Sequence, residues 1–127
     1  MKSLLKIVAA TVFTAIIFPM SAQAQGDASA GESNFNRKCK ICHTTEQGGA
    51  SKIGPNLFGV YNVKAGQTDF AYSKGLIDAD LTWDDATLDA YLLKPRDVVK
   101  RGKMVFAGLR REQERADMIA YLKSLTE

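Results

Sequence analysis

Residues 39–43 have the pattern C-x-x-C-H, which is typical of c-type haem attachment. Cys39 and Cys42 lie on one turn of backbone, so their thiols can reach the two vinyl groups of a single haem and form thioether bonds. His43 follows directly, and its imidazole then lies against one face of the porphyrin as an iron ligand. The motif therefore predicts one covalently bound haem c, attached at Cys39 and Cys42.

Other uses of this cysteine pair fit the chain less well. The whole sequence contains two cysteines and one histidine, so a four-ligand zinc site would have to recruit carboxylates. A thioredoxin-like dithiol requires a βαβ pattern around the motif, and the sequence has none. A disulfide would close a very small loop and would leave His43 unexplained. A chance C-x-x-C pair is the remaining alternative.

The first 24 residues have the pattern of a secretory signal peptide. Lys2 and Lys6 precede an apolar run over residues 7–18, and Ala22-Gln23-Ala24 forms an A-x-A cleavage site. We expect cleavage after Ala24, which leaves residues 25–127 as a single haem domain in the periplasm; an uncleaved membrane anchor is the alternative. Loss of the two lysines lowers the formal charge from +3 to +1, so overall charge says little about partners.

Helical periodicity predicts an all-α fold with three main helices. Asp27 can cap a helix that runs to about Lys38, and Thr82-Trp83-Asp84-Asp85 resembles a capping box for a second helix that ends at Pro95. The third helix covers residues 112–125, with the apolar stripe Met118, Tyr121, Leu122 and Leu125.

The segments between these helices are rich in glycine and lack periodicity, which predicts long loops over residues 44–63, 66–79 and 96–109. Long loops are unusual in so small a domain unless they surround something. A flat, apolar cofactor is a good candidate.

The second axial position of the iron has few candidate ligands. The sequence has no second histidine, both cysteines are used by thioethers, and Met1 and Met20 lie in the signal segment. Met118 falls in the apolar stripe of the last helix, which favours a core position. Met104 lies in a loop between glycines and is therefore the better candidate, although a solvent-facing methionine is the alternative. Ligation by His43 and Met104 would saturate the iron and suit transfer of single electrons.

Four motifs in this order resemble the class I c-type cytochromes, the group of soluble cytochrome c and bacterial cytochrome c2. They are Cys39-x-x-Cys42-His43, Gly54-Pro55-Asn56-Leu57, Lys103-Met104-Val105-Phe106-Ala107-Gly108 and Glu114-Arg115-Ala116-Asp117. The resemblance covers almost all of residues 26–123 and implies the cytochrome c fold, in which three main helices and long loops surround one haem.

The resemblance also implies roles for individual residues. The carbonyl of Pro55 accepts the proton of the non-ligating nitrogen of His43. Trp83 and Tyr72 bind the haem propionates, Tyr91 lies beside the methionine sulfur, and Phe106 lies at the exposed haem edge. Gly31 and Phe35 form the face of the first helix that crosses the last helix at Met118 and Tyr121.

The chain departs from the family pattern around the propionates. Val63 replaces a common arginine, Gly102 replaces a common threonine, and Lys100-Arg101 replaces a Pro-Gly pair. We expect either a thinner propionate network or one in which Arg101 takes over part of the missing charge. The lost cation predicts a lower potential than in a relative that carries the arginine.

These features predict a soluble, monomeric electron carrier of the periplasm that is not an enzyme and has no small-molecule substrate. Cations that can steer an acidic partner gather near the predicted haem edge: Lys94, Arg96, Lys100, Arg101, Lys103, Lys40 and Lys52. The partners would be acidic surfaces of a bc1-type complex, a terminal oxidase or a photosynthetic reaction centre. The cluster is short and lacks interleaved aromatics, so nucleic acid is not expected. The alternatives are a dedicated subunit of a periplasmic dehydrogenase or oxidase, and a haem peroxidase or gas sensor in which Met104 is labile.

Overall fold

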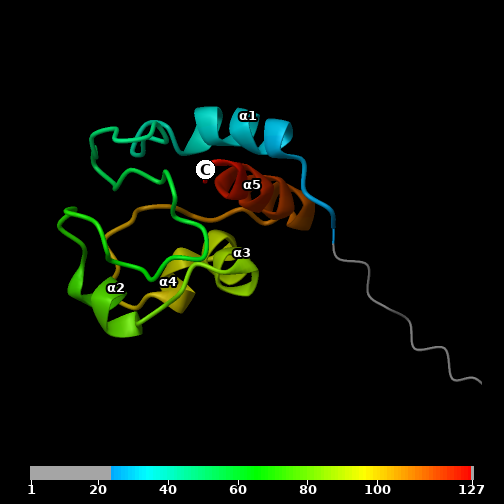
Figure 1. Cartoon of the computed structure of the whole chain (residues 1–127). Helices are drawn as coiled ribbons and strands as arrows, with labels where there is room; N and C mark the ends of the chain where they lie inside the picture. Colours follow the sequence, from blue (N-terminus) through cyan, green and yellow to red (C-terminus); the bar gives the residue numbers. More distant parts are fainter. Residues whose placement is uncertain (1–23, 127) are drawn as a thin grey trace, which may run out of the picture.

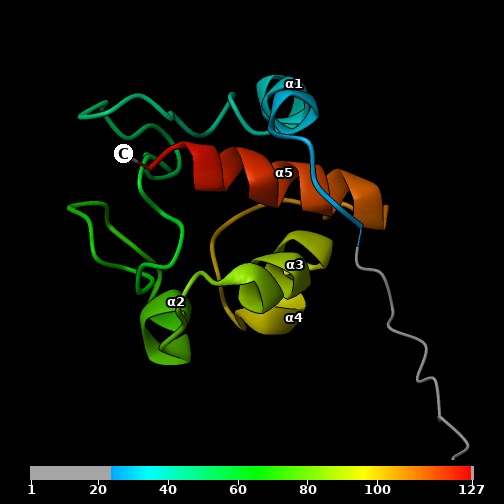
Figure 2. The same cartoon turned by 45° about the vertical axis from the view of Figure 1, so that its right-hand side comes forward.

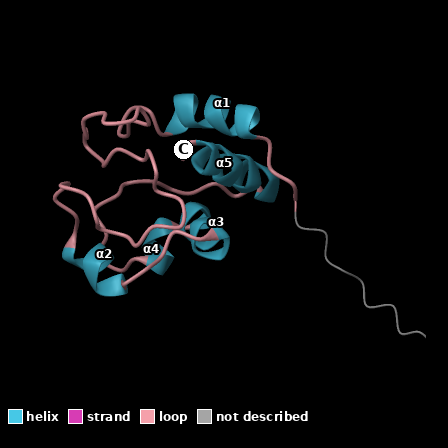
Figure 3. Ribbon diagram, in the orientation of Figure 1, coloured by secondary structure: helices cyan, strands magenta, loops and turns pink. Residues whose placement is uncertain are grey.

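The computed structural model describes residues 24–126 and contains five helices in that range. They are α1 (Ala28–Lys38), α2 (Lys74–Ala79), α3 (Asp85–Leu93), α4 (Pro95–Val98) and α5 (Glu112–Ser124). Figure 3 shows these helices joined by long loops, and the only extended pairing described is an isolated antiparallel bridge between Lys64 and Thr82. The all-α prediction is confirmed, with α1, α3 and α5 as the three main helices.

The start of α3 differs from the prediction. Its N-cap is Asp84, whose side chain accepts a hydrogen bond of 2.8 Å from the backbone N–H of Thr87. The expected capping box at Thr82 is therefore wrong by two residues. Thr82 instead pairs with Lys64 in the isolated bridge, which keeps its backbone extended and outside the helix.

Two short helices lie in segments that the sequence predicts as loops. Ser73 caps α2, and the helix ends at Asp80 in a left-handed conformation with φ of 50°. Pro95 ends α3 as expected, but it also stands in the first turn of α4. Backbone N–H groups in the first turn have no acceptor within the helix, so proline, which lacks this group, is tolerated there. Both helices are too short for a periodic apolar pattern.

The helices α1 and α5 cross at a steep angle and form one side of the molecule. Figure 1 shows α1 lengthwise above α5, and Figure 2 shows α1 almost end-on with α5 running beneath it and α3 below. Gly31 makes the crossing possible, because a Cβ at this position would lie 2.0 Å from the carbonyl oxygen of Asp117. Phe35 packs against Tyr121 with ring centroids 5.5 Å apart, so the predicted contact face is confirmed.

Polar contacts fix both ends of α1, including the end that leads into the C-x-x-C-H motif. Asp27 caps the start of α1 by accepting hydrogen bonds from Ser29 and Ala30. At the other end, Lys38 donates to the buried carboxylate of Glu114 on α5. This hydrogen bond lowers the pKa of Glu114, so its carboxylate stays charged at neutral pH. The residue directly before Cys39 is thereby held against α5.

The described residues include the predicted core but almost none of the predicted signal segment. Met118 is 1% exposed and belongs to the core, as its place in the apolar stripe predicts. Residues 1–23 of the predicted signal peptide lie outside the described residues. Within residues 24–126, no helix has both the length and the apolar character needed to cross a membrane.

Candidate haem site

A largely apolar cavity of about 410 Å³ lies among the long loops, α3 and the inner sides of α1 and α5. Its volume falls in the usual range for sites that hold small molecules and cofactors, roughly 300–1,000 Å³. All nine residues predicted for the haem site line this one cavity: Cys39, Cys42, His43, Pro55, Tyr72, Trp83, Tyr91, Met104 and Phe106. Residues from six separate stretches of the sequence are thus brought together.

The C-x-x-C-H motif forms a tight turn directly after α1. The backbone N–H groups of Cys42 and His43 both donate to the carbonyl oxygen of Cys39, at 3.0 Å and 2.9 Å. Both cysteines are free thiols, and burial raises the pKa of Cys39 to about 11. A thiol that keeps its proton is a poor redox nucleophile or zinc ligand. In addition, residues 24–126 contain no group of three or more side chains suited to hold a metal ion.

The imidazole of His43 is fixed by its backbone surroundings. Its Nδ1 lies 2.8 Å from the carbonyl oxygen of Pro55 and donates to it, so the other ring nitrogen keeps a free lone pair. His43 is 9% exposed, and burial lowers its pKa below the usual value even though the bond to Pro55 acts in the opposite direction. The ring is therefore neutral and oriented, as a metal ligand must be.

Gly54 contributes to this arrangement and was not predicted as a site residue. A Cβ at Gly54 would lie 2.4 Å from Cε1 of His43, so only glycine lets the ring lie against the backbone at this point. The signal for this role was present in the Gly54-Pro55 pair, because proline confines the preceding residue and glycine leaves space for the ring.

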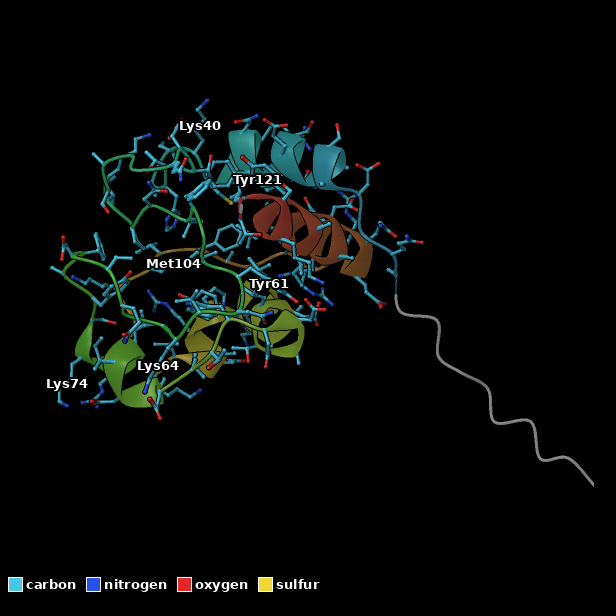
Figure 4. All side chains as sticks on the ribbon, in the orientation of Figure 1. Lys40, Tyr61, Lys64, Lys74, Met104 and Tyr121 are labelled. Carbon is cyan, nitrogen blue, oxygen red and sulfur yellow. The ribbon has the colours of Figure 1, made fainter. Side chains whose placement is uncertain are left out.

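Met104 also lines the cavity, and its sulfur accepts a hydrogen bond. The hydroxyl of Tyr91 on α3 donates to Sδ of Met104 at 3.3 Å. Burial raises the pKa of Tyr91, which keeps the hydroxyl protonated. Trp83 packs edge-on against the Tyr91 ring, with the ring centroids 4.8 Å apart. Figure 4 places Met104 in the middle of the molecule, between Lys40 on one side and Lys64 on the other.

The remaining predicted site residues lie around the rim and floor of the cavity. Trp83 is buried, Phe106 packs against the hydrophobic core, and Tyr72 shares a hydrogen bond of 2.6 Å with the hydroxyl of Thr68. Val63 lines the cavity but carries no charge. Arg101 is exposed and is not among the cavity-lining residues of the described chain, so its expected role near the propionates has no support in this geometry.

The mouth of the cavity combines cations with exposed apolar side chains. Several of the predicted cations have contacts of their own: Lys94 pairs with Asp97 at 3.1 Å, and Lys103 donates to the carbonyl of Ala71. Large apolar side chains at the same mouth were not predicted as functional: Ile41, Ile53 and Val105, the last of which is 89% exposed. Each of these residues stands alone in a glycine-rich loop, so no repeated apolar pattern in the sequence marked it.

The chemistry of the lining fits a haem. One neutral imidazole nitrogen and one thioether sulfur line the cavity, and two thiols lie on the turn beside the imidazole. Imidazole and thioether are both established ligands of haem iron, and the apolar walls suit the faces of a porphyrin. The close approach of Gly54 lets the His43 ring lie against the backbone, where Nδ1 is bound to Pro55 and Nε2 is left as the nitrogen that can bind iron.

Comparison with known proteins agrees with this geometry. A family model described as cytochrome c matches residues 28–126. Cytochrome c of Theileria annulata is 50% identical over 99 residues, which cover 78% of this chain and 86% of the relative. Cytochrome c of Chlamydomonas reinhardtii is 49% identical over 102 residues, which cover 80% and 91%. Cytochrome c2 of Rhodospirillum rubrum is 44% identical over 130 aligned residues, which cover 92% and 95%.

Proposed function

The chain belongs to the cytochrome c family, whose members are electron carriers with one covalently attached haem c, and from that premise we propose how its own residues hold the haem and where it works. Cys39 and Cys42 provide the thioether bonds, and His43 and Met104 provide the two axial ligands of the iron. The observation that supports this assignment is the position of His43 and Met104 in one apolar cavity, each with a hydrogen-bond partner.

The haem, when bound, supplies a one-electron couple, and the chain sets the conditions under which it operates. Pro55 keeps the His43 ring in one tautomer and one orientation. Tyr91 binds the sulfur of Met104 and withdraws electron density from it, which favours ferrous iron. Core residues such as Trp83 and Met118 exclude water from the cavity.

A carrier is favoured over a peroxidase or a gas sensor by the way in which Met104 is held. Chemistry on a bound small molecule needs an open or easily opened axial position. The hydroxyl of Tyr91 anchors the sulfur at 3.3 Å, so Met104 competes well with outside ligands. A dedicated subunit of one dehydrogenase or oxidase is the other candidate, and the exposed cavity mouth is compatible with it.

Export to the periplasm is proposed from the N-terminal pattern and from one comparison. The cytochrome c2 match covers 92% of this chain, whereas residues 25–127 are only 103 of its 127 residues, or about four fifths. The similarity to that relative therefore extends into the first 24 residues. Cleavage after Ala24 would release residues 25–127 as the diffusible carrier.

The cavity mouth is the proposed contact surface for redox partners. Arg96, Lys100 and Lys40 are exposed, and the last two directly neighbour lining residues in the sequence. These cations can attract acidic surfaces of a bc1-type complex, a terminal oxidase or a photosynthetic reaction centre. The exposed apolar side chains Ile53 and Val105 would be desolvated only in the complex. Steering by charge with a small apolar contact suits a short-lived complex.

The proposed ligation is tested by carbon monoxide binding to the reduced holoprotein. We expect the wild-type spectrum to stay unchanged under carbon monoxide at neutral pH, because Met104 occupies the second axial position. The variant Met104→Ala should bind the gas, and Met118→Leu, which changes a buried methionine outside the ligand set, should behave like the wild type. Ready binding by the wild type would contradict the proposed carrier.

The proposed export is tested by N-terminal sequencing of protein purified from the periplasmic fraction of an expressing bacterium. The expected first residue is Gln25. Recovery of Met1 from a membrane fraction would instead indicate a tethered form of the same domain.

The proposed partner surface is tested by oxidation of the reduced carrier by bacterial membrane vesicles that contain a terminal oxidase. We expect the rate to fall about tenfold or more between low and physiological salt, as for other charge-steered encounters. Arg96→Gln and Lys100→Gln should flatten this dependence. The control Lys74→Gln removes an exposed lysine on α2 that pairs with Asp78, and it should leave the dependence unchanged. A rate that ignores ionic strength would exclude steering by these cations.

A further inference from the structure

One buried arginine on α5 joins three segments of the protein. The guanidinium of Arg115 is 9% exposed, and its Nε donates to a carboxylate oxygen of Asp89 on α3 at 2.7 Å. Its Nη1 donates to the carbonyl oxygens of Leu109 and Arg110, both at 3.0 Å. These two carbonyls lie at the end of residues 99–111, which join α4 to α5 and carry Met104; we refer to them as the Met104 segment.

The same end of the Met104 segment is also tied directly to α3. The backbone N–H of Leu109 donates to the carbonyl oxygen of Leu92 at 2.7 Å, and Leu109 is fully buried. Gly108 has φ of +100°, and a Cβ at this position would lie 2.0 Å from the carbonyl oxygen of Leu93. The segment therefore cannot shift at this end unless α3 moves or these contacts break.

The helix α3 also carries the residue that binds the methionine sulfur. Tyr91, two positions after Asp89, donates its hydroxyl to Sδ of Met104. Asp89 and Tyr91 belong to one short helix. A contact that fixes Asp89 therefore also fixes the backbone position from which the Tyr91 side chain extends. Arg115 thus holds both partners of the Tyr91–Met104 bond, one through α3 and the other through the end of the Met104 segment.

We propose that Arg115 and Asp89 form a positioning pair that keeps Met104 in place and so limits how easily an outside ligand can displace it. Neither residue lines the cavity, so the pair acts through the Met104 segment and α3 rather than by contact with the haem. The Asp89 side chain is 44% exposed, but its removal leaves the buried guanidinium of Arg115 without a counter-charge, which makes the local structure easier to open. The inference rests on the proposed ligation by Met104.

The chain contains a matched control for this pair. Lys123 and Asp85 form a second ion pair between α5 and α3, with an N–O distance of 2.8 Å, and Lys123 also lies over the ring of Tyr61. This pair joins the same two helices, but both residues are exposed and their described contacts do not include the Met104 segment. Loss of this pair reports on helix docking alone.

The test combines imidazole titration of the ferric holoprotein with amide hydrogen exchange. We expect Asp89→Asn and Arg115→Lys to raise the affinity for imidazole about tenfold, a change of about 1.4 kcal/mol. Asp85→Asn should change the imidazole affinity by less than about twofold, because exposed ion pairs contribute little to stability. The exchange rate of the Leu109 amide should rise in parallel in the first two variants and stay unchanged in the third.

The outcomes separate this inference from the proposed ligation. Equal imidazole affinities in Asp89→Asn and Asp85→Asn, or an unchanged Leu109 exchange rate in both Asp89→Asn and Arg115→Lys, would overturn the positioning role while leaving Met104 as the ligand. If Met104→Ala binds imidazole no better than the wild type, Met104 is not the ligand, and both the ligation and the inference built on it fail.

Discussion

The hydrogen bond between Nδ1 of His43 and the carbonyl oxygen of Pro55 is the contact on which the site depends. It connects the turn that follows α1 to the loop that begins at Gly54, and it fixes which ring nitrogen can bind iron. The bond forms only because Gly54 has no side chain where the imidazole lies. A larger side chain at position 54 would turn the His43 ring away from the cavity, even if the rest of the fold formed correctly.

The other elements support the two proposed axial ligands, His43 and Met104. The crossing of α1 and α5 at Gly31, together with the pair of Lys38 and Glu114, sets where the C-x-x-C-H turn begins. At Met104, α3 positions Tyr91 against the sulfur and holds the end of the Met104 segment. Helices thus provide a rigid frame at both sides, while the loops between them contribute most of the cavity lining. An all-α architecture with long loops is therefore a consequence of enclosing a flat cofactor.

The sequence was most informative where chemistry depends on local spacing. Cys39, Cys42 and His43 follow from one motif, and Met104 follows from the small number of possible ligands; the structure brings all of them to one cavity. The start of α3 was misplaced because the pairing of Thr82 with Lys64 is a tertiary contact that no local pattern encodes.

The features that the sequence did not reveal depend on contacts between distant residues or on elements too short for periodicity. The helices α2 and α4 have six and four residues, so neither can show a repeated apolar stripe. Asp89 and Arg115 are 26 positions apart, and nothing in either local sequence indicates that they meet. The central claim, one haem bound covalently at residues 39–43, is tested most directly by the mass of the purified protein under denaturing conditions. The account predicts the chain plus one haem, with the added mass on the peptide that contains Cys39 and Cys42; a colourless protein of unmodified mass would contradict it.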